Sequence, residues 1–267
     1  RVPDPEIDTQ LAVGRQMTDE ELVIENSRGR VVGMISVATV AAMSAYFFCL
    51  WLVQKDRAAK PDQATDLVLI SDNSGFFILA FFFLAVGSLL LAPVLLHLAL
   101  AIRSRVPKAP RLIPILAVVG PVAVAIALPA FTFVQVSVAN DFADGTIKTV
   151  AEATRLAQSD ALDFTRYIYL VAQLVLAVAW AMVGVFSVRV GLLTKVVGYV
   201  AVAIGLASVI AAPLAAILSV FWIGAVSIML LGRGSQRPPA WAFGRAVSWR
   251  EIAEKGEEIR QEADREE

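Results

Sequence analysis

Histidine and cysteine are almost missing from this sequence of 267 residues, which contains one of each, His97 and Cys49. A single cysteine cannot form a disulfide within the chain, and one histidine cannot supply the ligand sets that zinc prefers. Cys49 lies inside an apolar run, where a free thiol behaves as a small hydrophobic side chain. We therefore expect no internal disulfide and no metal site.

Motifs for catalysis and for nucleic-acid binding are missing as well. The sequence has no nucleophile with a histidine or an acid at a recognisable spacing, and it has no glycine-rich phosphate loop. Its net charge of −1 and isoelectric point near 6.0 come without a basic stripe, which argues against nucleic acid as a partner. We expect a protein that is not an enzyme and that has no catalytic residue and no cofactor.

Charged residues are missing from five long stretches of the chain, although they make up 18% of all residues. Hydrophobic residues make up 58%, and the mean hydropathy is +0.69. Each stretch is long enough to cross a hydrocarbon core of about 30 Å as a helix. The pattern predicts an all-α, polytopic membrane helix bundle. The stretches are residues 31–53, 75–102, 112–138, 168–188 and 196–231.

The last stretch, residues 196–231, is too long for one ordinary span. As a single helix it would exceed about 50 Å. Pro213 lies near its middle, where a proline removes a backbone donor and clashes with the preceding turn. We predict that the chain reverses near Pro213 and that the bundle has six transmembrane helices.

Basic residues in the short loops predict how the helices are threaded. The loop RSRVPKAPR at 103–111 carries four basic residues and no acid, which is typical of a cytoplasmic loop. Alternation then places the loops 54–74 and 139–167 outside a plasma (inner) membrane. Both termini are predicted to be cytoplasmic. The predicted organisation is a cytoplasmic segment 1–30, a transmembrane domain 31–231 and a cytoplasmic segment 232–267.

Short helices are predicted in both cytoplasmic segments. Thr18 and Glu21 have the spacing of a capping box, and Ser248 and Glu251 repeat it near the other end. Aromatic side chains before and within the second helix are expected to hold it near the lipid headgroups, and a solvated tail is the alternative. These aromatic residues are Trp241, Phe243 and Trp249.

A further helix is predicted on the outer surface, within residues 145–164. Its periodicity places Ile147 and Val150 on an apolar face, opposite Lys148 and Glu152. Such a helix could cap an entrance or simply connect two spans.

Three polar side chains lie within the predicted spans: His97, Gln135 and Gln173. An ionisable group in lipid is costly, so His97 is a candidate functional residue. A neutral imidazole that is bonded to a neighbouring helix, or that lies near headgroup water, is the simpler alternative. Gln135 and Gln173 lie near the outer ends of their helices, and they predict either a mutual hydrogen bond or the lining of an outer vestibule.

Prolines and small residues mark special positions in the helices. Pro121 and Pro129 are candidate helix breaks together with Pro213, and breaks of this kind build ion sites in some transporters, although a kink without a ligand is the simpler alternative. Small residues at spacings of three and four predict a close-packed seam, within one chain or between chains. They are Ala177, Ala181, Gly184, Ala201, Gly205, Ser208 and Ala212.

Residues 29–231 resemble a family of uncharacterised bacterial six-helix membrane proteins, defined as a domain of unknown function. The family usually has Leu-Pro-Arg in one turn, where this chain has Leu-Thr-Lys at 193–195. The resemblance implies a six-helix bundle and no established activity or ligand. It rests on the GRVVGM stretch at 29–34, on Tyr167, Tyr169 and Gln173, on a turn that begins at Arg189, and on Gly198 and Gly205.

Two classes of function agree with these features. Uniformly apolar helices and helical cytoplasmic ends favour a non-catalytic scaffold or accessory subunit of a membrane complex. Six spans, mid-span prolines and large outer loops keep a homo-oligomeric passive channel or transporter as the alternative. Every Asp and Glu lies outside the predicted spans, which argues against an ion-coupled pump. The expected partners are the lipid bilayer and either further copies of the chain or other membrane subunits.

Overall fold

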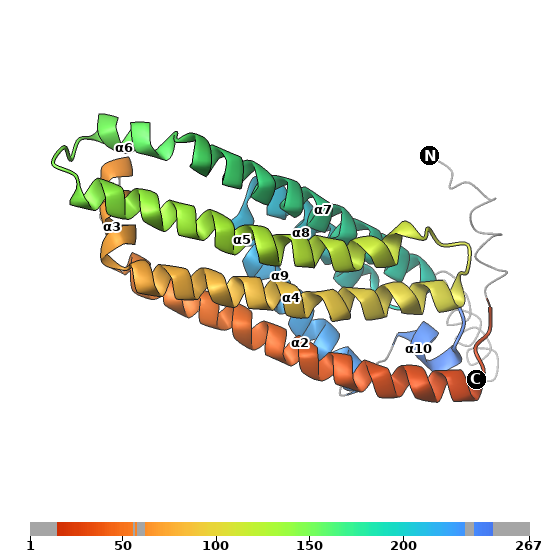
Figure 1. The fold of residues 1–267 in the computed structure, drawn as a ribbon. Coiled ribbons are helices and arrows are strands. Elements are labelled where there is room, and N and C mark those ends of the chain that lie inside the picture. Colours follow the sequence, from red (N-terminus) through yellow and green to blue (C-terminus); the bar gives the residue numbers. More distant parts are fainter. Residues whose placement is uncertain (1–14, 56, 58–61, 233–237, 248–267) are drawn as a thin grey trace, which may run out of the picture.

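The described part of the chain is a bundle of α-helices. The computed structural model describes residues 15–55, 57, 62–232 and 238–247 (Figure 1). Four long helices lie alongside one another: α2 (Asp19–Gln54), α4 (Ser74–Arg105), α5 (Leu112–Asp144) and α7 (Asp160–Val190). The shorter helices are α3 (Gln63–Asp72), α6 (Val150–Ala157), α8 (Lys195–Ile210), α9 (Ala212–Leu230) and α10 (Pro239–Phe243).

The length and composition of the helices confirm a multi-pass membrane protein. Five helices, α2, α4, α5, α7 and α9, are long and apolar enough to cross a membrane. Helix α8 is also apolar but has 16 residues. At a rise of about 1.5 Å per residue it reaches only about 24 Å, against about 54 Å for the 36 residues of α2.

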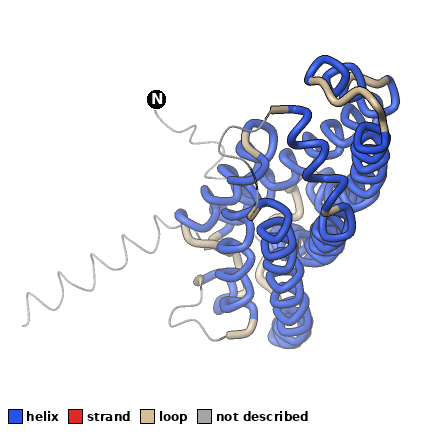
Figure 2. The backbone as a smooth tube through the Cα atoms, turned by 90° about the vertical axis from the view of Figure 1, so that its left-hand side faces the viewer, coloured by secondary structure: helices blue, strands red, loops and turns tan. Residues whose placement is uncertain are grey.

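Six helices pack into a closed ring. Helix α2 packs against α4, α4 against α5, α5 against α7, α7 against α8, and α8 against α9, which returns to α2. The view in Figure 2 shows the helices gathered around one another, with loops at their ends. Helices α3 and α6 pack on each other and on α5 at one end of the bundle, away from α10 (Figure 1).

The start of α2 matches the predicted capping box. The Thr18 hydroxyl accepts from the Glu21 amide, and the Glu21 carboxylate accepts from the Thr18 amide. The prediction of a separate short helix before the first span is wrong, since α2 continues without a break to Gln54. No proline interrupts this stretch, so each turn supports the next. The second predicted capping box, at Ser248 and Glu251, lies outside the described residues.

The chain reverses between α8 and α9, as Pro213 predicts. Ala211 leaves the helical conformation with φ −147° and ψ 71°, and Pro213 lies in the first turn of α9, where its missing N–H costs no helical hydrogen bond. The Trp222 Nε1 of α9 donates to the carbonyl oxygen of Val197 near the start of α8, at 2.8 Å. The two helices therefore form an antiparallel hairpin.

The other two candidate breaks, Pro121 and Pro129, do not break α5. The helix runs from Leu112 to Asp144 through both residues. Each proline removes one hydrogen bond, and packing against α4 and α7 holds the helix on either side. Of the two alternatives for these prolines, a helix break is therefore wrong, and a helix that continues through both residues is the one that the structure shows.

The predicted seam of small residues lies within the chain, between α7 and α8. A Cβ atom on Gly184 would lie 2.6 Å from the carbonyl oxygen of Gly198, and one on Gly205 would lie 2.6 Å from that of Ala177. Both distances are too short for a real contact, so only glycine permits this helix separation.

The helix predicted within residues 145–164 is shorter than that range and buries a different face. Helix α6 begins after Thr149, whose hydroxyl caps the Glu152 amide. Ile147 and Val150 are 60% and 48% exposed, whereas Ala153 is fully buried. The predicted apolar face is therefore wrong. The small Ala153 side chain lets α6 approach its neighbours closely, in a cluster that includes Leu67 of α3 and Phe142 of α5.

Candidate functional site

Polar and aromatic side chains from distant segments meet at one end of the bundle. This end holds the first turns of α2, the last turns of α4, the turn between α7 and α8, and α10 (Figure 1). Four side chains form its centre, and we call them the Arg105 cluster: Glu25, His97, Arg105 and Trp241.

Arg105 and Glu25 form a buried ion pair. Arg105 is fully buried, and the Glu25 side chain is 11% exposed. Arg105 Nη1 donates to Glu25 Oε1 at 2.9 Å, and Nη2 donates to Oε2 at 2.8 Å. This bidentate geometry matches the planar guanidinium to the carboxylate, and it joins α4 to α2 in one orientation.

The remaining donors of Arg105 bind backbone carbonyl groups. Nε and Nη2 donate to the carbonyl oxygen of Ala240 at 3.1 and 3.0 Å, and Nη1 also donates to that of Ala101 at 3.0 Å. The guanidinium carbon lies 5.3 Å from the centre of the Trp241 ring, a distance at which the ring attracts a cation. A buried charge with this many partners is well satisfied.

Trp241 joins α10 to the turn between α7 and α8. Its Nε1 donates to the carbonyl oxygen of Leu192 at 2.9 Å, and the residue is 6% exposed. The Val247 amide donates to the Val190 carbonyl at 3.1 Å in the same region. The prediction that Trp241 lies among lipid headgroups is therefore wrong, because the indole is enclosed by protein. Phe243 is 58% exposed, and Trp249 lies outside the described residues.

His97 packs against the same tryptophan. The imidazole stacks on the Trp241 ring, with centroids 5.7 Å apart and an angle of 16°. His97 is 9% exposed, and its Nε2 atom has no hydrogen-bond partner among the described residues. A Cβ atom on Gly29 would lie 3.4 Å from Nε2. His97 is therefore held by ring stacking and by close approach to α2.

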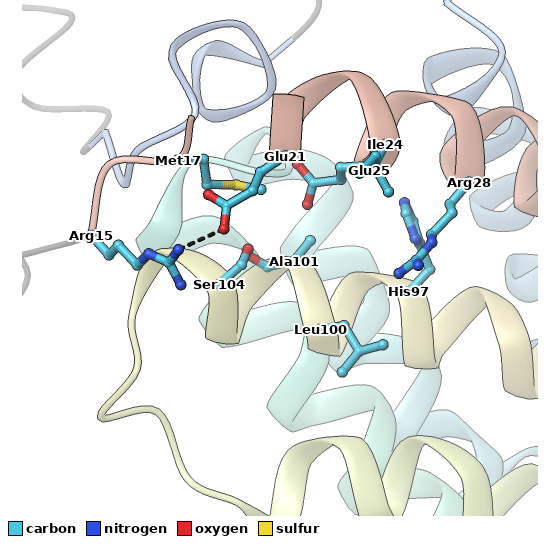
Figure 3. A pocket seen from close by; sticks show the side chains of 10 residues that line it. All are labelled: Arg15, Met17, Glu21, Ile24, Glu25, Arg28, His97, Leu100, Ala101 and Ser104. Atoms are coloured by element: carbon cyan, nitrogen blue, oxygen red, sulfur yellow. Dashed lines mark hydrogen bonds and ion pairs between the residues drawn. The ribbon is translucent and has the colours of Figure 1, made fainter. Parts of the chain in front are cut away.

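A cavity of about 240 Å³ opens beside the cluster (Figure 3). His97, Glu25 and Arg28 line it, and Arg15 forms an ion pair with Glu21 at its border. The lining carries both signs of charge, so it offers no uniform field for either a cation or an anion. The geometry favours a contact surface for polar groups of both signs over a site for one ion.

The predicted polar residues of the spans do not meet. Gln173 Nε2 donates to the Tyr169 hydroxyl one turn away, at 2.5 Å. No hydrogen bond joins it to Gln135, which is partly buried on α5, in the part of the chain that the structure describes. His97 lies in the Arg105 cluster, away from both.

The central pair of the cluster was not predicted from the sequence. Glu25 and Arg105 are 80 positions apart, so no local spacing connects them. The sequence places both outside the predicted spans, where charges at the membrane surface are expected. The position of Glu25 on the α2 face that also bears Gly29 and Gly33 is a signal that could have pointed to a buried partner.

The described residues contain no group of three or more His, Cys, Asp or Glu side chains that could hold a metal ion. Comparison with known proteins finds no family model, no curated protein and no solved structure that matches the chain.

Proposed function

We propose that this chain is a non-catalytic scaffold or accessory subunit of a complex in the bacterial plasma membrane. In this proposal it crosses the membrane six times and has both termini in the cytoplasm. The observation that carries the proposal is the buried Arg105–Glu25 pair, which holds α2, α4 and α10 together at one end of the bundle.

A fixed end suits docking better than transport. A carrier must open each end of its pathway in turn. Opening this end would separate Arg105 from Glu25 or from the Ala240 carbonyl, and would leave a buried charge without its partners. Breaking a buried pair in this way costs about 3–5 kcal/mol. A subunit that keeps one conformation does not meet this cost.

The proposed topology has two supports. The α8–α9 hairpin brings the chain back to the end where α2 begins and α4 ends, as an even number of crossings requires. The basic loop 103–111 lies at that same end and is typical of the cytoplasmic side. The resemblance to six-helix proteins of unknown function fits the same arrangement.

An impermeant thiol reagent tests this topology in a background without Cys49. Lys108→Cys and Lys148→Cys replace exposed residues at opposite ends of the bundle. We expect Lys148→Cys to react in intact cells and Lys108→Cys to react only after the cells are opened. The reverse pattern would place both termini outside.

Purification with native partners tests the function. A tagged chain extracted in mild detergent is expected to bring down a fixed set of other membrane chains in constant ratio. Purification of the chain alone, as a homo-oligomer that conducts a solute in reconstituted vesicles, would contradict the proposal.

A homo-oligomeric passive channel or transporter is the second candidate. A cavity of about 290 Å³ inside the bundle favours it. Flux measurements on reconstituted vesicles separate the two candidates. A subunit should show no flux, whereas a channel should show flux that follows the imposed gradient.

A further inference from the structure

This second cavity lies inside the ring of helices and does not share a lining residue with the Arg105 cluster. Residues of α2, α4, α5, α7, α8 and α9 border it. Ser208 and Pro213 line it from the two sides of the hairpin turn. Because α8 and α9 are much shorter than the four long helices, the turn leaves space between those helices inside the bundle.

The lining is neutral and largely apolar. No charged side chain borders the cavity. Aromatic rings form much of its wall: Tyr46, Phe81, Tyr169 and Trp180. Pro213 is exposed on the outside of the bundle, so the cavity adjoins the surface that faces lipid. These features suit a neutral molecule that dissolves in the bilayer.

Two residues of the lining carry hydroxyl groups that form no hydrogen bond within the described part of the chain. Tyr46 is 7% exposed and Ser88 is 4% exposed. Both line the cavity, and neither forms a hydrogen bond with any residue that the structure describes. Ser208 and Ser219 differ, because their hydroxyls donate to carbonyl groups of their own helices. Neither hydroxyl is among the fully enclosed polar atoms without a partner, so each keeps accessible surface at the cavity and is available to a ligand.

Tyr169 adds a third donor. Its oxygen accepts a hydrogen bond from Gln173 Nε2, which leaves its own O–H free to donate. The cavity therefore offers hydroxyl donors from three helices, α2, α4 and α7, and no ionised group. A carbonyl oxygen is the complementary group, since it accepts hydrogen bonds and carries no charge.

We propose that this cavity binds a neutral, mainly apolar molecule through a carbonyl oxygen, held by the hydroxyls of Tyr46, Ser88 and Tyr169. Two sources in the bilayer share this chemistry: the ring carbonyl of a quinone and the ester carbonyl of a lipid. The inference goes beyond the proposed scaffold function and does not depend on it.

Tryptophan fluorescence tests the quinone source, because Trp180 lies in the cavity wall. Decylubiquinone is titrated into the purified full chain in nonionic detergent. Saturable quenching is expected. Tyr46→Phe removes one hydroxyl and keeps the ring, so it should weaken binding roughly fivefold, the effect of one lost hydrogen bond. Ser88→Leu fills the space and should abolish binding.

Matched variants on the outer surface are the controls. Tyr199→Phe changes an exposed tyrosine of α8, and Ser137→Leu changes an exposed serine of α5. Both should bind decylubiquinone as the original chain does. Thermal unfolding of each variant separates loss of the ligand from loss of the fold, and Tyr46→Phe decides the test if Ser88→Leu does not fold.

Native mass spectrometry tests the lipid source with equal amounts of ester-linked and ether-linked phosphatidylcholine. Preferential retention of the ester lipid, lost in Tyr46→Phe, would assign the carbonyl to a lipid. Saturable quinone binding that is lost in Ser88→Leu would assign it to a quinone ring. The proposal is overturned if neither ligand is selected, or if the folded Tyr46→Phe variant binds both as tightly as the original chain.

Discussion

The indole Nε1 of Trp222 donates a hydrogen bond to the carbonyl oxygen of Val197 at 2.8 Å. The same indole lies edge-on to Trp180 of α7, with ring centroids 4.7 Å apart. Trp222 is 2% exposed. This one side chain therefore connects α7, α8 and α9, which follow one another along the chain. It holds the α8–α9 hairpin closed.

Replacing Trp222 tests this connection. Trp222→Phe keeps an aromatic ring and removes the donor, so the free energy of unfolding should fall by about 1–2 kcal/mol. Trp222→Ala also creates a cavity and should lower it by about 3–5 kcal/mol. Unfolding with a denaturing detergent, followed by circular dichroism, measures both changes. Equal stability of the two variants would show that the hairpin does not depend on this ring.

The glycines of the α7–α8 seam give a second prediction. Gly205→Ala would place a Cβ atom 2.6 Å from the Ala177 carbonyl oxygen, so the helices must separate and stability should fall by about 1–3 kcal/mol. Gly224→Ala is the matched control, because no atom lies within 4 Å of its Cβ position. That change should leave stability unchanged or raise it slightly, since alanine favours a helix. Thermal unfolding of the two variants compares them directly, and equal melting temperatures would contradict the close packing.

Local and periodic features of this fold could be predicted from the sequence. Hydropathy located the apolar helices, the Thr18–Glu21 spacing located the start of α2, and Pro213 located the reversal. Each of these signals depends on a few consecutive residues. The glycines of the seam were also recognisable, because their spacing on one helix face is itself a local property.

The Arg105 cluster could not be predicted in the same way. Its four members come from three helices, α2, α4 and α10, and the partner of a buried charge depends on how those helices pack. Arg105 belongs to the basic loop that predicts the cytoplasmic side. A residue of such a loop is expected at the surface, so its burial could not be predicted. Trp241 was misplaced for a related reason, since an aromatic residue beside a span fits a lipid interface and a protein interior equally.

We predict that acid destabilises helix α3 by protonating its capping residue, Asp62. Hydrogen bonds from the hydroxyl and the amide of Thr65 hold the pKa of Asp62 below its ordinary value of 3.8. The cap therefore stabilises α3 fully above that value, and the stabilisation is lost as the pH falls through the lower pKa of the folded state. Amide hydrogen exchange in residues 63–72 should accelerate in this range.

Asp62→Asn is the control for this response. Asparagine caps a helix through its amide oxygen and does not titrate, so exchange in α3 should not gain this acid-dependent acceleration. Comparison of the two chains at each pH cancels the intrinsic pH dependence of exchange. The Arg57–Asp66 pair is present in both chains. Identical exchange in the two chains at every pH would show that Asp62 does not hold α3.

We predict that neutralising the glutamate of the buried ion pair lowers the free energy of unfolding much more than neutralising the glutamate of an exposed pair. Glu25→Gln leaves the Arg105 charge buried without its counter-charge and should lower the free energy of unfolding by about 3–5 kcal/mol. Glu152→Gln breaks an exposed pair with Arg155, and stability should not change measurably. The double variant Glu25→Leu with Arg105→Met removes both charges and should recover much of the loss. Chemical denaturation measures all three, and a double variant as unstable as Glu25→Gln would contradict the electrostatic explanation.

We predict that replacing His97, the one histidine of the sequence, does not destabilise the fold. Its imidazole is held by stacking on Trp241, and its Nε2 has no partner among the described residues. His97→Phe keeps the stack and removes the unpartnered nitrogen, whose burial is unfavourable. The larger ring has space on the side where His97 borders the cavity of about 240 Å³. Stability should therefore be unchanged or higher.

Trp241→Ala is the contrast, since it removes the stack and the hydrogen bond to Leu192, and it should lower stability by about 3–5 kcal/mol. Both variants are measured by thermal unfolding and by co-purification of partner chains. A His97→Phe variant that folds normally but loses its partners would show that the histidine acts in function and not only in packing.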